Sequence, residues 1–361
     1  MNAPPCEIVD KLAVMRRWLA AYGAVALRLR SVDWFAWATG GASNAVLLAQ
    51  ETGVAELLIT AADAYVLTDE IEAQRLQEEE VGAGWTWQIV PWAEPGAREH
   101  FVARVAGGGM LLSDRPAPHE QSLPDAARAE RFVLHATEHQ RYREVGRLAA
   151  AAMSEALHIA RPHWSEYELA GAGARALWMR GLHPALVLAA GESRLSRYRH
   201  PLPSAAPLGR CAMLVFCARQ FGLYANLTRF VSFEPQSGPH DDAIMALEAA
   251  ALNECRDGRP LSAIYQALAG AYAQMGQPDA IHEHHQGGIT GYLARELLAT
   301  PDTRLPIRNG MALAFNPSLR GSKIEDTFLL VDNKLENLTF DPSWPSRLVD
   351  GRLRPTSLEA W

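Results

Sequence analysis

The pattern of apolar residues changes between residues 114 and 124, and this change divides the chain into two parts. The segment holds three prolines and has no regular period, which is typical of a linker. The length of 361 residues is also enough for about two domains. We therefore expect one domain over residues 1–124 and a second domain over residues 125–361.

Short apolar runs separated by Gly, Ser and Asp indicate strands in the first part. They cover residues 24–29, 45–48, 56–60 and 64–67. The polar segment 69–81 follows them and consists mainly of good helix formers. This mixture predicts an α/β layer domain.

Amphipathic helices come first in the second part. One is predicted over residues 128–157, and a second begins at Ser165, where Ser165 and Glu168 have the spacing of a capping box, and ends near Gly181. Further helices are expected over 242–255 and 262–275, and strands over 212–218, 223–233, 311–315 and 327–331. Helices followed by strands predict an α+β domain.

The charge of the chain limits its partners. A net charge of -7 and a pI near 6.0 argue against binding to nucleic acid or to an anionic membrane. The sequence contains neither a run of 18 apolar residues nor a signal-peptide pattern at its start. The four cysteines have no paired, metal-type spacing. We therefore expect a cytoplasmic protein that binds neither nucleic acid nor a membrane.

Four sequence blocks follow one another in the second part, and two shorter blocks precede them in the first part. The four are RYRHPLP (197–203), GLYANLTRF (222–230), HHQGG (284–288) and GSKIEDTFLLV (321–331), and the two are WATGG (37–41) and VLTD (66–69). In these blocks the chain resembles the creatinase, prolidase and aminopeptidase P family. The resemblance implies an α/β creatinase-like N-terminal domain, an α+β pita-bread catalytic domain and a homodimer.

The resemblance also implies where metal ligands would lie. Metal-dependent members hold two divalent ions with two Asp, one His and two Glu side chains. The matching positions in this sequence are Val215, Asn226, His285, Asn316 and Glu325. Hard divalent cations require anionic oxygen ligands, and only one carboxylate is left in this set. We therefore expect neither a metal pair nor another cofactor.

Creatinase is the family's example of hydrolysis without a metal, and the resemblance assigns its acid and base to His200. A histidine suits both roles because its pKa lies near neutrality. Glu325 would then bind the nitrogen end of the substrate or attack the substrate. The alternatives are a turn histidine at 200 and a strand glutamate paired with Lys323 or Arg320.

Other polar residues are predicted to contact the substrate. They are Asn226, His284, His285, Tyr292, Arg295 and Asn316. Arg295 offers a planar fork for a carboxylate, but it could equally pair with Glu296 on a helix surface. The three histidines within residues 282–285 could hold a single metal ion, although their spacing is not that of a helical metal site.

Together these features predict a metal-independent hydrolase of C–N bonds. Its substrate would be a small amide, amidine or cyclic amidine derived from an amino acid. Two alternatives remain. One is an Xaa-Pro-type metallopeptidase with a divergent site, and the other is a catalytically inactive pita-bread protein that binds a small molecule or a protein.

Overall fold

A computed structural model describes residues 5–94, 96–235 and 241–360. The chain divides into two compact units, Met1–Arg131 and Phe132–Trp361, which we call the N-terminal and C-terminal units. The segment predicted as a linker belongs to the N-terminal unit, where β6 (Glu120–Ser122) pairs in parallel with β5 (Leu111–Ser113). Isolated prolines flank this edge strand, and they produced the linker-like pattern.

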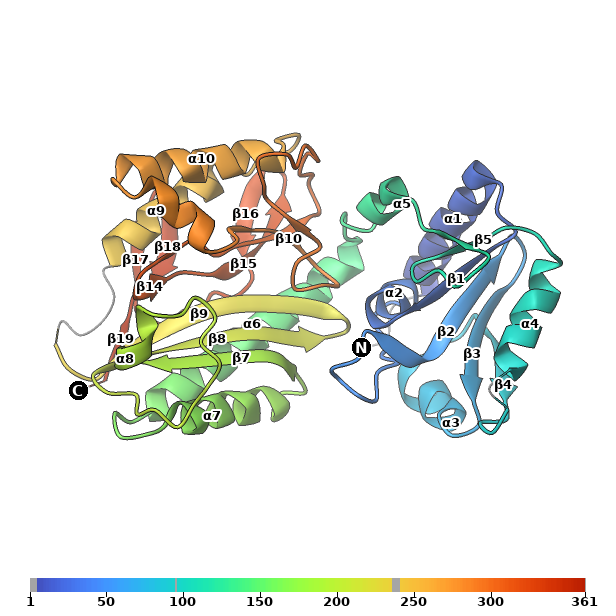
Figure 1. Cartoon of the computed structure of the whole chain (residues 1–361), viewed down its shortest axis with the longest axis horizontal. Coiled ribbons are helices and arrows are strands. Elements are labelled where there is room, and N and C mark those ends of the chain that lie inside the picture. Colours follow the sequence, from blue (N-terminus) through green and yellow to red (C-terminus); the bar gives the residue numbers. More distant parts are fainter. Residues whose placement is uncertain (1–4, 95, 236–240, 361) are drawn as a thin grey trace. The chain divides into compact units, whose positions relative to one another are not determined.

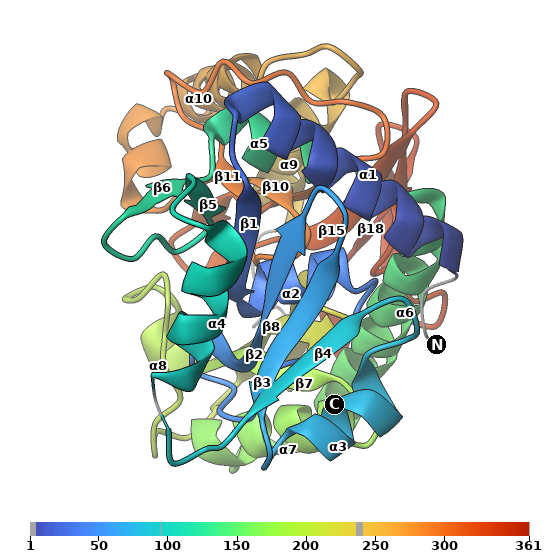
Figure 2. The same ribbon diagram turned by 90° about the vertical axis from the view of Figure 1, so that its right-hand side faces the viewer.

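The N-terminal unit is built on one mixed sheet with the strand order β4-β3-β2-β1-β5-β6. Its longer strands are β1 (Ala26–Ser31), β2 (Thr52–Thr60), β3 (Ala64–Asp69) and β4 (Thr86–Val90), which lie side by side in Figure 2. Helices α1 (Pro5–Tyr22) and α2 (Val32–Ala38) lie on one side of the sheet, and α4 (Ala97–Ala106) lies on the other (Figure 1). This is the α/β layer architecture expected from the sequence.

Two local predictions in this unit were wrong. Residues 45–48 form no strand, and the side chains of Val46 and Leu47 are each 58% exposed. The apolar run therefore lies on the surface instead of in the sheet. The segment 69–81 is not one α-helix but a short turn of helix α3 (Ala73–Arg75) followed by the π-helix η1 (Leu76–Glu80). The helix begins only at Ala73, because the Asp69 carboxylate accepts the backbone N–H of Ile71 and forms a turn directly after β3.

One sheet of the C-terminal unit has the order β19-β9-β8-β7. Its strands are β7 (His183–Gly191), β8 (Cys211–Gln220), β9 (Leu223–Ser232) and β19 (Leu358–Glu359). Helices α6 (Ala136–Ile159) and α7 (Glu166–Trp178) bury their apolar sides against it. Strands β8 and β9 form a continuous antiparallel hairpin, which closes through Phe221 and Gly222 at φ 53° and 77°. This hairpin carries two of the predicted ligand positions.

The second sheet of this unit has the order β11-β10-β12-β15-β16. Its strands are β10 (Gly287–Thr290), β11 (Leu297–Leu298), β12 (Ala312–Phe315), β15 (Asp326–Val331) and β16 (Lys334–Asn337). Figure 1 shows the two sheets between the helix pair α6 and α7 and the pair α9 (Asp241–Glu254) and α10 (Leu261–Gln274). An isolated bridge between Thr228 and Glu325 joins β9 to the start of β15. Both sheets therefore contribute residues to one place.

Short elements complete the unit. They are α8 (Glu192–Leu195), the 3-10 helix η2 (Pro278–Glu283), and the hairpins β13 (Ser318–Leu319) with β14 (Ser322–Lys323) and β17 (Ser346–Val349) with β18 (Arg352–Pro355). None of the helices within the described ranges is long and apolar enough to cross a membrane.

The predicted capping box of Ser165 and Glu168 is confirmed at the start of α7. The single helix predicted over residues 128–157 is instead two helices, α5 (Asp125–Glu130) and α6. The break arises because His135 takes an extended conformation and caps α6 together with Glu138. Strand β7 and helices α1 and α2 were not predicted.

Candidate functional site

Three histidines lie together in the C-terminal unit. His200 comes from the loop after α8, and His284 and His285 come from the segment between η2 and β10. The Nε2 atoms of His200 and His284 are 2.9 Å apart, and the ring centroids of His284 and His285 are 4.4 Å apart. His284 is buried, whereas His200 and His285 keep part of their surface exposed. A buried imidazole is thus linked to one that solvent can reach.

The hydrogen bonds fix which nitrogen carries the proton in this pair. His284 Nδ1 donates to the backbone carbonyl of His285 at 2.5 Å, because a carbonyl can only accept. In a neutral ring, His284 Nε2 is then the acceptor, so His200 donates through its Nε2–H. This leaves Nδ1 of His200 as the nitrogen with a free lone pair.

All three imidazoles are held in the neutral form. Burial, followed by the charge of Lys323, lowers the pKa of His284 to about 3. Burial and the charge of Arg295 lower the pKa of His285 to about 4. The pKa of His200 is also lowered, first by burial and then by Lys323. Neutral imidazoles can act as bases near pH 7.

Glu325 lies beside these histidines and is almost completely buried. Its Oε1 is 2.5 Å from Nη2 of Arg295, and its Oε2 is 3.3 Å from Nζ of Lys323. The hydroxyl of Thr228 also donates to Oε2, at 3.1 Å. Burial alone would raise the pKa of this carboxyl, but the charges of Lys323 and Arg295 outweigh it and lower the pKa to about 2. Glu325 is therefore a carboxylate held between two cations.

The two predicted asparagines each bring one unsatisfied acceptor. Asn226 is fully buried, and its Nδ2 donates to the hydroxyl of Thr290 at 3.0 Å. Asn316 is 2% exposed and directly follows β12. Within the described residues, Oδ1 of Asn226 and Oδ1 of Asn316 have no hydrogen-bond partner. A buried acceptor without a partner is costly, and a bound ligand can satisfy it.

Tyr292 forms hydrogen bonds with two glutamates. Its hydroxyl donates to Oε1 of Glu138 in the first turn of α6, at 2.5 Å. Its backbone N–H donates to the Glu296 carboxylate. These contacts attach Tyr292 to the helix side of the unit, and its contact with a substrate stays a prediction.

Close packing of the backbone explains the two glycines of the HHQGG block. A Cβ on Gly287 would lie 2.1 Å from the carbonyl oxygen of Ala314, and a Cβ on Gly288 would lie 2.1 Å from that of Leu297. Both glycines also have positive φ. Close approach of the neighbouring strands β12 and β11 therefore requires them.

Two residues near the site, Lys323 and Cys217, were not predicted from the sequence to belong to it. Lys323 was considered only as an ordinary partner of Glu325, although residues two apart on an extended segment share a face, and this spacing was the available signal. Cys217 pairs with Asn226 across β8 and β9 and lies close enough to Glu325 to feel its charge. Burial raises the pKa of the Cys217 thiol to about 12, so it stays protonated and is no nucleophile at ordinary pH.

The donor set does not fit a pair of divalent metal ions. Val215, on β8 opposite Thr228, offers no donor atom, and the side chains of Asn226 and Asn316 are neutral amides. Lys323 and Arg295 already place two positive charges on the one remaining carboxylate. Two divalent cations at this position would meet repulsion from these side chains and too little anionic charge.

The three histidines offer a different set of donor atoms, which could bind a single metal ion. One ligand nitrogen from each of His200, His284 and His285 lies within 4.8 Å of the others. Three imidazoles with an open fourth position are a known donor set for zinc. The histidine cluster is therefore compatible with one transition-metal ion, and of the five positions of the metal pair it includes His285 alone.

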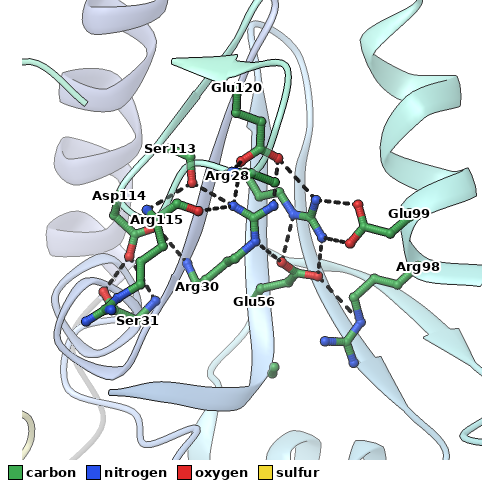
Figure 3. Close-up of polar contacts among 12 residues, drawn as sticks. Arg28, Arg30, Ser31, Glu56, Arg98, Glu99, Ser113, Asp114, Arg115 and Glu120 are labelled. Carbon is green, nitrogen blue, oxygen red and sulfur yellow. Dashed lines mark hydrogen bonds and ion pairs between the residues drawn. The ribbon is translucent and has the colours of Figure 1, made fainter. Parts of the chain in front are cut away.

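A second charged cluster, in the N-terminal unit, is saturated by its own contacts. Arg28 is 2% exposed and forms hydrogen bonds with the carboxylates of Glu56, Glu99 and Glu120 at 2.5 to 3.2 Å (Figure 3). Arg30 bonds Glu120 as well. The cluster borders a cavity of about 410 Å³ that is also lined by Arg98 and Trp92. Because Arg28 has no donor left, we assign the cluster to the stability of the sheet.

Comparison with known proteins relates the chain to peptidases. Among curated protein sequences, none matches it. The chain is similar in structure to the prolidase from Pyrococcus horikoshii OT3, with 18% identity, a TM-score of 0.77 and coverage of 92% of this chain and 98% of that chain. It is also similar to the dipeptidase PepE from Mycobacterium ulcerans, with 17% identity, a TM-score of 0.77 and full coverage of both chains.

A third similar structure is not described as a peptidase. It is the N-terminal domain of the FACT complex subunit SPT16 from Cicer arietinum, with 12% identity, a TM-score of 0.70 and coverage of 92% of this chain and 96% of that chain. At such identities these likenesses show the fold. The sequence model of metallopeptidase family M24, whose members hydrolyse C–N bonds, matches residues 140–332, which is more than half of the chain. The chain thus has the pita-bread fold and belongs to metallopeptidase family M24.

Proposed function

We propose that this chain is a metal-independent hydrolase of C–N bonds, with the C-terminal unit as its catalytic domain. The substrate is a small amide, amidine or cyclic amidine derived from an amino acid. The observation that carries the proposal is the hydrogen-bonded pair of His200 and His284 next to a carboxylate held by two protein cations. This arrangement supplies a base and positive charge from side chains alone.

His200 acts as the general acid and base in the proposed reaction. Its Nδ1 takes a proton from water while the water oxygen bonds to the substrate carbon. The C–N bond then breaks, and the same proton passes to the leaving nitrogen. His284 positions His200 through the Nε2 contact and keeps it in the required tautomer. His285 and Asn316 line the site from the side of β10 and β12.

Glu325 binds the nitrogen end of the substrate or attacks the substrate carbon. Its contacts favour binding over attack. Arg295 and Lys323 stabilise the carboxylate charge, and a carboxylate with so low a pKa is a weak nucleophile. Asn226 and Asn316 accept N–H groups of the substrate through their unsatisfied Oδ1 atoms.

The proposed enzyme works as a homodimer in the cytoplasm on a small molecule, and it binds neither nucleic acid nor membranes. The net charge of -7 supports the last two statements, since both surfaces repel an acidic protein. Light scattering of the purified protein tests the dimer. A single-chain mass at micromolar concentration would contradict it.

A second candidate function is a peptidase of the Xaa-Pro type that uses one metal ion. The compact group of His200, His284 and His285 favours it. In that case the histidines bind a metal instead of a substrate or a proton. Its substrates would be dipeptides, as the prolidase and dipeptidase names of the similar structures suggest.

Metal analysis combined with an activity screen separates the two candidates. The protein is analysed by inductively coupled plasma mass spectrometry before and after dialysis against a chelator, and both samples are tested on acyl amino acids, cyclic amidines and Xaa-Pro dipeptides. We expect hydrolysis that survives dialysis and is lost in His200→Ala. Activity that disappears with the chelator and returns with zinc, manganese or cobalt would refute the metal-independent function and support the peptidase.

A further inference from the structure

The sheet of the N-terminal unit has a cavity at one of its edges. Strands β1, β3, β4 and β5 run in the same direction, because β1 pairs in parallel with β5, β3 pairs in parallel with β4, and β2 lies antiparallel between β1 and β3. Their carboxyl ends therefore meet at one edge of the sheet. The cavity of about 410 Å³ lies here, bordered by Asp69 and Val90, the last residues of β3 and β4. In open α/β sheets, small molecules bind in the crevice beyond the carboxyl ends of the strands.

Helix α4 covers only part of the sheet face that carries this cavity. Apolar side chains of α4 pack on Ala26 and Leu58. Toward the carboxyl edge the same face becomes charged, because Arg28 and Glu56 lie two residues further along β1 and β2. The cavity begins beside Arg98 in the first turn of α4. The charged part of the face is therefore left open to solvent.

The charged side chains that line the cavity do not balance. They are the cations Arg28, Arg30 and Arg98 and the carboxylates Glu56, Asp69, Glu94 and Glu99. Four carboxylates against three cations leave one negative charge in excess. All three arginines pair with Glu56, Glu99 or Glu120 (Figure 3).

Asp69 and Glu94 take no part in these pairs. Oδ1 of Asp69 accepts the backbone N–H groups of Ile71 and Glu72. Within residues 5–94, 96–235 and 241–360, neither Asp69 nor Glu94 forms an ion pair. Asp69 is half-buried and Glu94 is exposed, so solvent reaches both carboxylates. The excess negative charge therefore lies on this side of the cavity and attracts a cation.

An exposed aromatic ring lines the same side of the cavity. Trp92 lies two residues after the end of β4 and two residues before Glu94, and it is 67% exposed. The face of an indole ring attracts ammonium and guanidinium groups, and nearby carboxylates add to this attraction. A metal ion would use the carboxylates alone, whereas an organic cation uses the carboxylates and the ring.

We propose that this cavity binds a small organic cation, an alkylammonium or alkylguanidinium compound, through Trp92, Asp69 and Glu94. The volume of about 410 Å³ is typical of small-molecule sites. The cluster of Arg28 and Glu56 forms the opposite wall and keeps its role in the stability of the sheet. All of these residues belong to the N-terminal unit, so the site does not depend on the proposed hydrolase.

A fluorine label on tryptophan tests the site in the full chain. The protein is produced with fluorotryptophan, and the fluorine NMR signal of Trp92 is assigned as the one that is missing in Trp92→Phe. This signal is followed during titration with n-butylguanidinium and with n-butylurea, an uncharged molecule of nearly the same shape. We expect the cation to bind about fivefold or more tightly than the urea. Because the signal reports on Trp92, binding in the C-terminal unit is distinguished from binding here.

Variants that remove one charge locate the bound cation. Glu94→Gln and Asp69→Asn should each weaken binding of butylguanidinium about threefold, and the double variant should bind it no better than butylurea. Glu79→Gln removes the same charge from an exposed glutamate of η1 outside the cavity and should leave the preference unchanged. Circular dichroism establishes that each variant is folded. Should Asp69→Asn fail to fold, Glu94→Gln still decides, because Glu94 is exposed.

The outcomes either support or overturn the cation site. An unchanged Trp92 signal, equal affinity for butylguanidinium and butylurea, or a preference that Glu94→Gln does not reduce would overturn it. Displacement of butylguanidinium by calcium chloride at equal concentration would identify a metal-ion site instead and would also overturn it. A preference that depends on Glu94 and Asp69 supports the cation site whether or not the chain hydrolyses C–N bonds.

Discussion

Replacing Glu325 by glutamine tests whether this carboxylate holds the two cations in place. The glutamine side chain keeps the shape and can still accept from Thr228, so the substitution removes mainly the negative charge. It leaves Lys323 and Arg295, 6% and 15% exposed, with their shared counter-ion lost. Loss of one partner from a buried ion pair costs about 3–5 kcal/mol of unfolding free energy. We expect a loss in this range for Glu325→Gln.

Differential scanning calorimetry measures this loss. For a unit of the size of Phe132–Trp361, each kcal/mol lowers the melting temperature by roughly 2–4 °C, so the C-terminal transition should fall by about 10 °C. Hydrogen exchange of the β9 and β15 amides identifies which unit the shifted transition belongs to. Calorimetry suits this chain because its two units need not unfold in one step.

Two further variants make the result decisive. Glu336→Gln removes a carboxylate from an exposed pair with Arg143, 2.8 Å apart, and should cost less than about 1 kcal/mol. The double variant Glu325→Gln and Lys323→Met should recover part of the loss, because a single buried cation remains. If Glu325→Gln lowers the transition no more than Glu336→Gln does, the buried ion cluster does not exist as described.

Three other predictions concern stability. Between pH 7 and pH 5 the free energy of unfolding should fall, because burial lowers the pKa of His284 from 6.5 to about 3 and the unfolded chain binds the proton first. The contribution of His284 to the slope approaches about 1.4 kcal/mol per pH unit below pH 6.5, and urea titrations of His284→Gln should lose this contribution while that of His285 remains. Arg28→Met should destabilise the N-terminal unit by about 3–5 kcal/mol in calorimetry, since the buried carboxylate of Glu56 loses its closest cationic partner, whereas Arg17→Met, at a side chain 64% exposed, should change it by less than about 1 kcal/mol. Gly146→Ala in α6 should cost about 1–3 kcal/mol or more in urea unfolding, because its Cβ would lie 2.2 Å from a backbone carbonyl, while Gly171→Ala in α7, with open space around it, should gain about 0.5–1 kcal/mol.

The sequence predicts those parts of the fold that depend on local pattern. The capping box at Ser165 and Glu168 depends on two residues three apart, and it is present as predicted. The run at residues 45–48 is apolar by composition but lies on the surface, because nothing within it specifies a pairing partner. The break before α6 also escaped prediction, since it depends on His135, which is an uncommon capping residue.

The candidate site also has a part that the sequence predicts and a part that depends on the fold. The sequence blocks place His200, His284 and His285 as candidates, and the structure brings their rings together. Sequence alone could not show that Arg295 reaches Glu325 instead of a neighbour on a helix, because that contact joins residues 30 positions apart through the fold. Nor could it show that Asn226 and Asn316 each keep an unsatisfied oxygen, which depends on every neighbour they have.

The charge at Glu325 also limits which chemistry the fold can support. The same pita-bread fold occurs in a prolidase and in a FACT complex subunit, so the fold does not determine the reaction. A divalent metal ion stabilises negative charge on an oxygen and also lowers the pKa of a bound water. Lysine and arginine side chains supply the first effect but not the second. A site that depends on Lys323 and Arg295 therefore needs a separate base to activate water. We propose His200 for this role, because burial lowers its pKa and its Nε2 contacts His284.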